Sequence, residues 1–258
     1  MKPLRISVVS DLHCRTSMPQ GFNPAGMKPA DVLVVAGDVS VSSLYDYYVS
    51  GIREAAKDKF KSMFFIRGNH DYYCTKQDKA YKPSVHENVV FTVVQAEGVG
   101  DDCKCRYVDF VCSPMWSPIT HNKQLVLCCL NDYHFIPGFS VEGCTELFWE
   151  NLEWMERVVH ASKADGHDVV IVTHHLPRHE LISPKFRNSD VNDAFCVMDP
   201  EAEARLIALE PKLWIHGHSH DFMDVTLDGV RYVRNPLGYE RAFSHEDTGY
   251  RPDFIVEV

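Results

Sequence analysis

The sequence has no long hydrophobic run and no recognisable export leader. None of its stretches approaches the roughly 20 consecutive apolar residues that a transmembrane helix needs. Met1 to Arg5 lead directly into an apolar, strand-like run, without the apolar core or the small-residue cleavage site of a signal peptide. We therefore expect a cytoplasmic protein that does not associate with membranes.

Positive charge is also scarce. The 258 residues include 26 Lys and Arg against 36 Asp and Glu, which gives a formal net charge of -10 at pH 7. A protein that captures the nucleic-acid backbone over a broad surface needs the opposite balance, so this function class is not expected. A single phosphate group could still bind where metal ions supply local positive charge.

Paired cysteine motifs are missing as well. The chain contains no CxxC pair with a matching partner pair, and its number of cysteines is odd, so neither a standard zinc site nor a disulfide framework is indicated. A structural zinc at the CxC of Cys103 and Cys105, or at the adjacent Cys128 and Cys129, is the alternative to free thiols in a reducing compartment. The cysteines are Cys14, Cys74, Cys103, Cys105, Cys112, Cys128, Cys129, Cys144 and Cys196.

The chain also lacks internal repeats, low-complexity tracts and Pro- or Ser-rich linkers that would divide it. With 45% hydrophobic and 24% charged residues, it has the composition of a protein that buries one sizeable core. We therefore expect a single domain over residues 1–258.

Apolar, strand-like runs alternate with helix-like segments from end to end, which predicts an α/β fold. Several runs are continuously apolar, as in strands that are covered on both faces. The predicted strands are Leu4–Ser10, Val32–Ala36, Met63–Arg67, Val89–Val94, Tyr107–Cys112, Val169–Thr173, Leu213–His216, Met223–Leu227, Val230–Arg234 and Phe254–Val258.

Helices are predicted where apolar residues recur at helical spacing. The clearest covers Glu146–Ser162, and an Asp-Pro-Glu sequence at residues 199–201 provides the cap and first turn of a second. A third helix, with a weaker pattern, is predicted over Ser42–Lys57. The segments 113–143 and 176–198 lack firm periodicity, and we expect long loops or partly helical insertions there, of the kind that often carry specificity.

Several of the apolar runs end abruptly in side chains that bind metal ions. The carboxyl ends of strands in an α/β sheet meet at one edge, so separate runs can deliver these groups to one site. A lone Asp or His after a strand is usually a turn or packing residue, and only the combination indicates a metal centre. The run ends carry Asp11 and His13, Asp38, Asn69, His70 and Asp71, His174 and His175, and His218 and His220.

Taken in order, the motifs DxH, GD, GNHD, THH and GHxH resemble those of the calcineurin-like metallophosphoesterases, and the resemblance extends from Asp11 to His220. It implies a four-layer α-β-β-α sandwich, in which two mixed sheets face each other between helices. The protein Ser/Thr phosphatases of this family carry a DRG extension after GD, whereas here Val39, Ser40 and Val41 follow. A nuclease would need a basic groove or an added DNA-binding module, which the sequence does not offer.

The resemblance also implies a dinuclear metal centre in which Asp38 bridges two divalent ions. His174 holds the position of the family's ligand in THH, and His175 is the open alternative. Mixed carboxylate, amide and imidazole ligands suit manganese, iron or zinc. The implied ligands are Asp11, His13, Asp38 and His220 for one metal, and Asp38, Asn69, His174 and His218 for the other.

The positive charge of two divalent ions exceeds the negative charge of two aspartates and a bridging hydroxide, so the cluster would attract phosphate although the chain is acidic. The family's reaction is hydrolysis of a phosphoester by the metal-bridging hydroxide. His70 would assist the leaving group, Asp71 could orient the His70 imidazole, and Asn69, His70 and His175 would contact the substrate.

We therefore expect a phosphodiesterase or phosphatase that acts on a small phosphoester, including the option of a nucleotide. The alternative is a catalytically weak metal-binding scaffold for protein partners, which the complete ligand set disfavours. The oligomeric state is left open.

Residues outside the motifs could complete the site. Asn235–Tyr239 could return to it, and His216 is expected to be a packing residue behind it. Two groups of residues each have a functional and a structural interpretation. The first group could form an aromatic wall that stacks on a base, or could simply pack: Trp116, His134 and Phe135. The second could contact substrate oxygens, or could lie in a solvated loop: Arg178, Lys185, Arg187 and Asn188.

Overall fold

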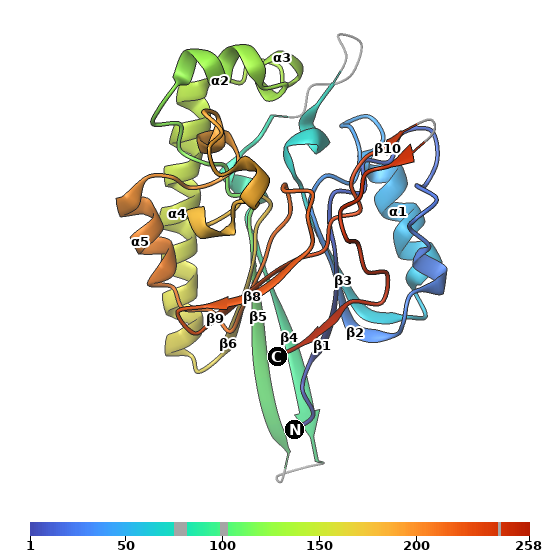
Figure 1. The fold of residues 1–258 in the computed structure, drawn as a ribbon. Helices are drawn as coiled ribbons and strands as arrows, with labels where there is room; N and C mark the ends of the chain where they lie inside the picture. Colours follow the sequence, from blue (N-terminus) through green and yellow to red (C-terminus); the bar gives the residue numbers. More distant parts are fainter. Residues whose placement is uncertain (75–81, 99–102, 242–243) are drawn as a thin grey trace.

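The computed structural model describes residues 1–74, 82–98, 103–241 and 244–258. In this part of the chain, two mixed β-sheets face each other and helices cover their outer faces (Figure 1). Within the described ranges, no helix combines the length and the apolar character that crossing a membrane requires.

The first sheet has the strand order β12-β1-β2-β3. It contains β1 (Arg5–Val9), β2 (Ala30–Ala36), β3 (Phe60–Ile66) and β12 (Ile255–Glu257). The first three strands are parallel, whereas β12 runs antiparallel to β1. The carboxyl ends of β1, β2 and β3 therefore meet at the same edge.

The second sheet has the order β4-β5-β6-β7-β9-β8. Its strands are β4 (Val89–Glu97), β5 (Lys104–Cys112), β6 (Asp168–Val172), β7 (Leu213–Ile215), β8 (Met223–Leu227) and β9 (Val230–Arg234). The central strands are parallel, while β4 and β8 are antiparallel to their neighbours. Every predicted strand overlaps an observed one, and a short pair, β10 (Glu240–Arg241) and β11 (Ser244–His245), was not predicted.

The strands β1, β2, β6 and β7 read as continuous apolar runs because both of their faces are covered, whereas β4 and β8 are partly exposed. Alternate residues of β1 and β2, such as Ile6 and Val34, pack between the sheets against Phe110 and Val172. Their neighbours along the strand point outward, and Val35 belongs to a second core with α1.

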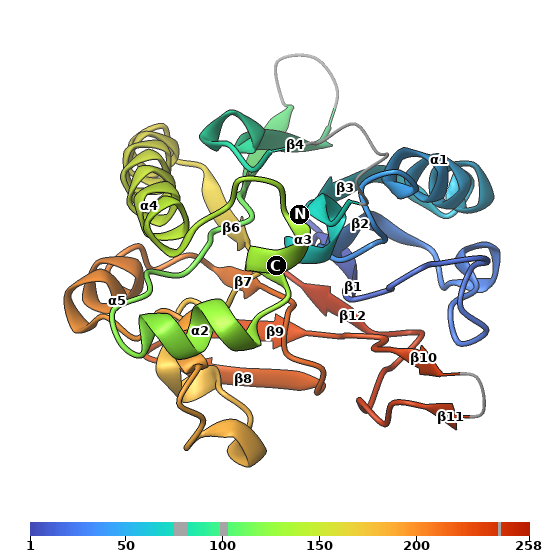
Figure 2. The same cartoon turned by 90° about the horizontal axis from the view of Figure 1, so that it is seen from above.

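Helices form the outer layers. α1 (Tyr45–Ala56) buries a stripe of residues at helical spacing against the first sheet. α4 (Val141–Ala164) and α5 (Pro200–Ile207) cover the second sheet, as Figure 2 shows from above. Asp199 caps α5 as predicted, and α4 starts before the predicted boundary because Ser140 accepts a cap hydrogen bond from the amide of Gly143. The four-layer α-β-β-α sandwich is thereby confirmed.

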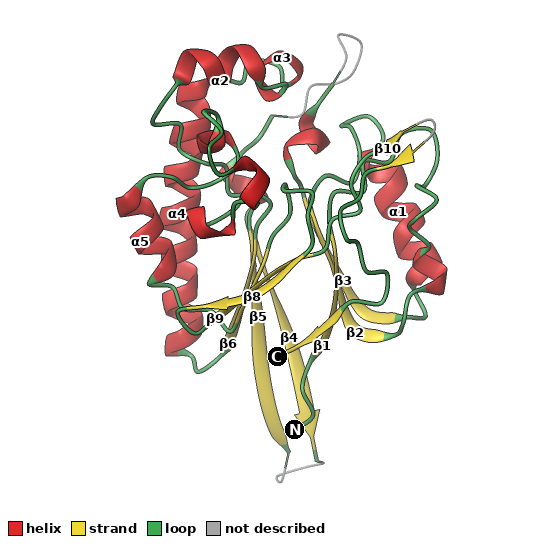
Figure 3. Cartoon of the chain, viewed as in Figure 1, coloured by secondary structure: helices red, strands yellow, loops and turns green. Residues whose placement is uncertain are grey.

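The two segments without periodicity contain short helices. Residues 113–143 include α2 (Lys123–Cys129) and α3 (Asp132–Phe135), and residues 176–198 include three single 3-10 turns. Loops gather at the end of the sandwich where β1, β2 and β3 finish (Figure 3). These segments therefore surround the edge at which the metal-binding side chains were expected.

Candidate metal centre

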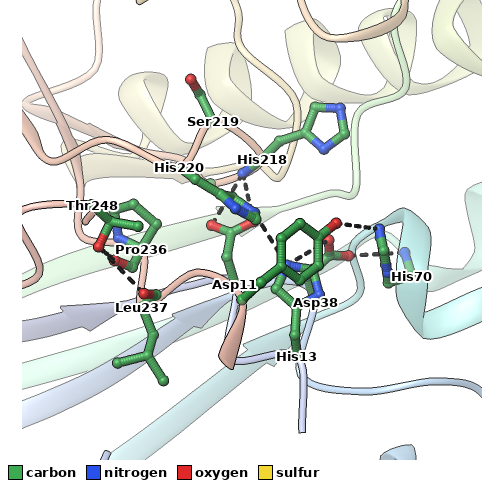
Figure 4. A network of polar contacts seen from close by, with 12 residues as sticks. Asp11, His13, Asp38, His70, His218, Ser219, His220, Pro236, Leu237 and Thr248 are labelled. Carbon is green, nitrogen blue, oxygen red and sulfur yellow. Dashed lines mark hydrogen bonds and ion pairs between the residues drawn. The ribbon is translucent and has the colours of Figure 1, made fainter. Parts of the chain in front are cut away.

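The predicted side chains converge at this edge. Asp11 and His13 follow β1, Asp38 follows β2, and His70 lies in the turn after β3. The second sheet contributes from the segments that follow β6 and β7, including His220. Figure 4 shows Asp11, His13, Asp38, His70 and His220 directed toward one another, although they are far apart in the sequence.

The backbone at this edge is strained in a specific way. Asp11, His13, Asp38 and His218 have positive φ angles of 54°, 46°, 55° and 67°, which non-glycine residues rarely adopt. Such a conformation costs about 1–3 kcal/mol and persists only where surrounding contacts enforce it. Here the amide of His13 donates to the Asp38 carbonyl at 2.9 Å, and the amide of His218 donates to Asp11 Oδ1 at 3.0 Å. The strain therefore lies on candidate metal ligands.

The glycine before Asn69 is required by close packing. A Cβ atom on Gly68 would lie 2.3 Å from Asp38 Oδ1 and 2.6 Å from His174 Nε2, closer than real Cβ contacts allow. Gly37 is equally constrained, since its Cβ would meet His174 Nδ1 at 2.3 Å and its φ is +88°. The two sheets can therefore bring their polar groups together only because these positions lack side chains.

One group of metal-binding atoms comes from Asp11, His13 and His220. His220 Nε2 lies 3.5 Å from Asp11 Oδ1 and 3.1 Å from His13 Nε2. His13 Nε2 lies 3.8 Å from Asp38 Oδ2, so Asp38 faces this group through one oxygen.

A neighbouring group comes from Asp38, His174 and His218. His174 Nε2 lies 3.4 Å from Asp38 Oδ1 and 3.1 Å from Asn69 Oδ1. Asp38 thus faces the second group through its other oxygen. His218 Nε2 is buried and has no hydrogen-bond partner among the described residues.

Surrounding groups hold these side chains in orientations that direct their free atoms inward. His174 donates from Nδ1 to the Ala36 carbonyl at 2.9 Å, and His220 donates from Nδ1 to Glu246 Oε2 at 2.6 Å. Asn69 donates from its amide nitrogen to Asp132 Oδ1 at 2.7 Å, which leaves its carbonyl oxygen facing His174.

The electrostatics follow from burial and from the proximity of opposite charges. Burial would raise the pKa of the Asp38 carboxyl, but the charges of His174 and His70 outweigh it and hold that pKa well below its usual value. Burial lowers the pKa of His13 to about 3, so its ring is neutral at ordinary pH. For His174, burial is overcome by the charge and hydrogen bond of Asp38, which raise the pKa to about 9.

This arrangement fits divalent metal ions. Several nitrogen and oxygen atoms with lone pairs face one another in a buried space, where they repel each other unless a proton or a cation lies between them. The unpartnered Nε2 of His218 points to the same conclusion. Imidazole nitrogens, carboxylates and an amide oxygen together are typical ligands of transition-metal ions.

His70 lies beside the cluster without being enclosed by it. Its backbone amide donates to Asp38 Oδ1 at 2.9 Å, and its Nε2 lies 3.2 Å from the hydroxyl of Tyr239. Its ring packs against Tyr73, with centroids 4.3 Å apart. The predicted return of the segment 235–239 to the site is confirmed, since the Tyr239 ring also lies 4.3 Å from the ring of His13.

The contacts of Asp71 do not support the orienting role predicted for it. Its carboxylate is buried and accepts hydrogen bonds at 2.8 Å from two backbone amides, those of Ser40 and Gly68. Asp71 therefore ties the turn after β3 to the loop after β2, and Tyr239 occupies the place beside the His70 imidazole. Burial, together with the nearby negative charge of Asp38, raises the pKa of Asp71 to about 7.

The two histidines of THH point in different directions. His174 faces Asp38 and Asn69, whereas His175 is buried behind the cluster, with its ring 5.1 Å from Trp116 and 4.4 Å from His218. A cavity lies beside the cluster and is lined in part by Asp38, His70 and His218. Of the described residues that line it, none is His175, so the structure offers no support for its predicted contact with substrate. His216 is likewise fully buried, in agreement with a packing residue.

Within the two groups with open interpretations, Trp116 and Arg178 have structural contacts. Trp116 is buried in the core beneath the site and offers no open face to a base, whereas Phe135 is half exposed beside Tyr73. Arg178 is tied to Glu180 and Asp228 at 2.5 and 2.9 Å rather than directed at the cluster.

Asp132 and Glu246 were missed by the sequence reasoning. They follow no strand-end motif, and each reaches the cluster across a long sequence separation, such as the 63 residues between Asn69 and Asp132. No local pattern in the sequence marks them.

The free cysteines add no further metal group. The Sγ atoms of Cys103 and Cys105 lie 3.8 Å apart on the surface. Among the described residues, the groups able to hold a metal are built from His, Asp and Glu only.

Solved structures of low sequence identity share this fold. A phosphopantetheinyl hydrolase from Mycobacterium tuberculosis is 14% identical, with a TM-score of 0.59, over 92% of this chain and 90% of that chain. A dimetal phosphatase from Danio rerio is 12% identical, with a TM-score of 0.51, over 92% and 88%. GAP50, the anchor in the inner membrane complex of Plasmodium, is 13% identical, with a TM-score of 0.50, over 96% and 77%. None of the curated proteins compared with this sequence matches it.

The sequence itself matches one family over most of its length. Residues 4–222 of the 258 agree with the family described as calcineurin-like phosphoesterase. This range includes all the strand-end motifs, and the facing mixed sheets agree with it. The chain therefore belongs to the calcineurin-like phosphoesterase family.

Proposed function

We propose that this chain hydrolyses a phosphoester bond at a dinuclear metal centre in which Asp38 bridges the two ions. The observation that carries the proposal is the position of the Asp38 carboxylate, with Oδ2 3.8 Å from His13 Nε2 and Oδ1 3.4 Å from His174 Nε2. The proposed ligands are Asp11, His13, Asp38 and His220 for one ion, and Asp38, Asn69, His174 and His218 for the other.

When bound, two manganese, iron or zinc ions would supply Lewis acidity that activates water and polarises phosphoryl oxygens. The chain itself contributes orientation. The carboxylate of Glu246 holds His220 through Nδ1, and Asp132 holds the Asn69 amide, so that neither ligand needs to reorganise during the reaction.

His70 is the proposed group that acts on the leaving oxygen. Its ring borders the cluster and lies in the lining of the adjacent cavity, where a departing alkoxide would emerge. The Tyr239 hydroxyl, 3.2 Å from His70 Nε2, acts as a positioning group for that ring. A donor in this place would protonate the leaving oxygen or stabilise its negative charge.

The test is the activity of protein stripped of metal and reloaded separately with Mn²⁺, Fe²⁺ or Zn²⁺. We expect hydrolysis of p-nitrophenyl phosphate or bis(p-nitrophenyl) phosphate with at least one metal, and its loss on chelation. Asp38→Asn should abolish turnover, whereas the matched control Asp58→Asn changes an exposed carboxylate outside the site and should leave turnover intact.

The alternative is a metal-binding scaffold for protein partners. The Plasmodium anchor has a similar fold, and a fold alone does not determine function, so the structure is compatible with this alternative. Wild-type protein that binds its metals in full yet turns over neither ester with any of them would overturn the hydrolase proposal in favour of the scaffold.

A further inference from the structure

The cavity beside the metal centre extends well beyond the candidate ligands. Its volume is about 380 Å³, within the range of roughly 300–1,000 Å³ that is usual for small-molecule sites. Asp38, His70 and His218 form one part of its lining. The remainder includes a set of hydrophobic residues, here called the apolar wall: Leu130, Leu176, Ile182, Phe186, Val191 and Phe195.

The apolar wall begins directly at a candidate metal ligand. The ring of Phe195 stacks on that of His218, with centroids 4.7 Å apart and an interplanar angle of 27°. Leu176 and Ile182 are buried, whereas the ring of Phe186 is 48% exposed. The wall therefore runs from the reacting centre to the solvent.

Hydrogen bonds to backbone carbonyls hold the wall in place. The amide of Leu176 donates to the Phe195 carbonyl at 3.1 Å, and the side-chain amide of Asn192 donates to the Phe186 carbonyl at 2.9 Å. A surface that is already ordered loses less conformational entropy when a ligand binds to it.

Charge in the cavity is sparse and negative away from the metals. Among the described residues that line it, none is Lys or Arg. Its remaining carboxylates are engaged, since Asp132 accepts from Asn69 and Tyr73, and Glu246 accepts from His220. A second phosphate group on a substrate would find no positive partner among these residues.

We propose that the apolar wall binds an uncharged, apolar arm of the phosphoester that is cleaved. This inference rests on the proposed hydrolase function and names its substrate class. A nucleotide, expected as one option from the sequence, is the competing substrate class. The base and sugar of a nucleotide carry hydrogen-bonding groups that would lose water against the partly buried side chains of Leu130, Val191 and Phe195 without gaining partners from them.

The test uses phosphodiesters that share one leaving group and differ only in the arm. Methyl, butyl and hexyl p-nitrophenyl phosphate are compared with thymidine 5′-p-nitrophenyl phosphate on the metal-loaded protein. Each methylene that becomes buried should raise kcat/KM about threefold to fourfold. Hydrolysis of the methyl ester without a gain along the series, or a preference for the thymidine ester, would overturn the inference and leave the proposed function standing.

Variants at the mouth of the cavity locate the effect. Phe186→Ser and Val191→Asn should each lower the hexyl-to-methyl ratio of kcat/KM, since each replaces part of the wall with a polar side chain. Tyr47→Ala removes a 73% exposed aromatic ring from α1 and should leave the ratio unchanged. Unchanged ratios in both wall variants would place the arm elsewhere and contradict the inference.

A binding measurement separates the inference from catalysis. Calorimetric titration of the metal-loaded protein should give at least tenfold tighter binding of hexylphosphonate than of methylphosphonate. Tighter hexylphosphonate binding without turnover of any ester would refute the proposed function and keep the apolar wall as a binding site. Equal affinities would overturn the inference whether or not esters are hydrolysed.

Discussion

At the scale of single residues, the site depends on which atom of each side chain is left free. His174 and His220 each use Nδ1 for a hydrogen bond to protein, so Nε2 faces the cluster. His70 differs, because its Nε2 lies near the hydroxyl of Tyr239. His70 also lies within reach of His13 and Asp38 as a possible ligand, and its contact with Tyr239 supports the proposed role on the substrate instead.

His70→Ala should therefore keep the metals and slow hydrolysis. Loss of a general acid typically costs about 10²–10⁴-fold in rate, so we expect a fall in kcat of that order with unchanged metal content. Elemental analysis and steady-state kinetics on the same sample measure both quantities. The control His160→Ala removes an exposed imidazole from α4 and should behave as wild type. Loss of metal in His70→Ala, or an unchanged kcat, would contradict the assigned role.

Metal binding should release protons. Burial opposes protonation of His220, but the hydrogen bond and charge of Asp11 raise its pKa to about 9, and Asp38 does the same for His174. At about pH 7.5 both rings of the metal-free protein are protonated, and a metal ion must displace those protons to reach Nε2. Affinity should thus rise with pH up to about 9.

Calorimetry in two buffers with different ionisation enthalpies measures this release. We expect about two protons per chain near pH 7.5 and progressively fewer as the pH approaches 9, where both rings of the metal-free protein become neutral. Binding without proton release near pH 7.5 would show that neither ring takes part.

The sequence reasoning succeeded at this scale where chemistry and strand ends coincide. Asp11 and Asp38 follow apolar runs that form the neighbouring parallel strands β1 and β2, so their ends meet at one edge, and His174 follows β6 of the facing sheet. Asp71 also lies in such a motif, yet its carboxylate accepts hydrogen bonds from two backbone amides. This orientation could not be predicted, because the residue type does not determine where a side chain points within a turn. Glu246 reaches His220 through tertiary structure alone.

At the scale of elements, most strands were predictable because strands buried on both faces are continuously apolar in sequence. The strands β10 and β11 consist of two residues each, which is too short for a recognisable pattern. The helices α2 and α3 lie in the segment 113–143, which was predicted as a long loop or partly helical insertion, because neither helix is long enough to show clear periodicity. They nevertheless matter for the site, since Asp132 begins α3 and holds Asn69.

The junction between β3 and its following turn offers a test at this scale. Gly68 has φ -103°, which any residue can adopt, so Gly68→Ala adds a methyl group without backbone strain. That methyl group would collide with Asp38 Oδ1 and His174 Nε2, and we expect loss of metal and activity with secondary structure retained. Circular dichroism and elemental analysis measure the two effects.

Gly51→Ala in α1 is the matched control. No atom lies within 4 Å of the added Cβ, and replacing a helical glycine by alanine should stabilise the protein by about 0.5–1 kcal/mol while leaving metal binding intact. Gly68→Ala protein that binds metal at the wild-type level would show that the close approach is not required.

At the scale of the whole molecule, two facing sheets bring one polar cluster together, although the chain carries a net charge of -10. The family match ends at residue 222, yet Tyr239 and Glu246 return from beyond it to contact His70 and His220. β9 and β12 also lie beyond this limit and extend the two sheets. The site is therefore a product of nearly the entire fold.

The metal content of Asp38→Ala tests the central claim most directly. Asp38 faces both halves of the cluster, so its side chain is the one whose loss should affect both ions. Elemental analysis after reconstitution should find about two ions per chain in the wild type and neither in Asp38→Ala. Full metal occupancy in Asp38→Ala would contradict the bridged dinuclear centre.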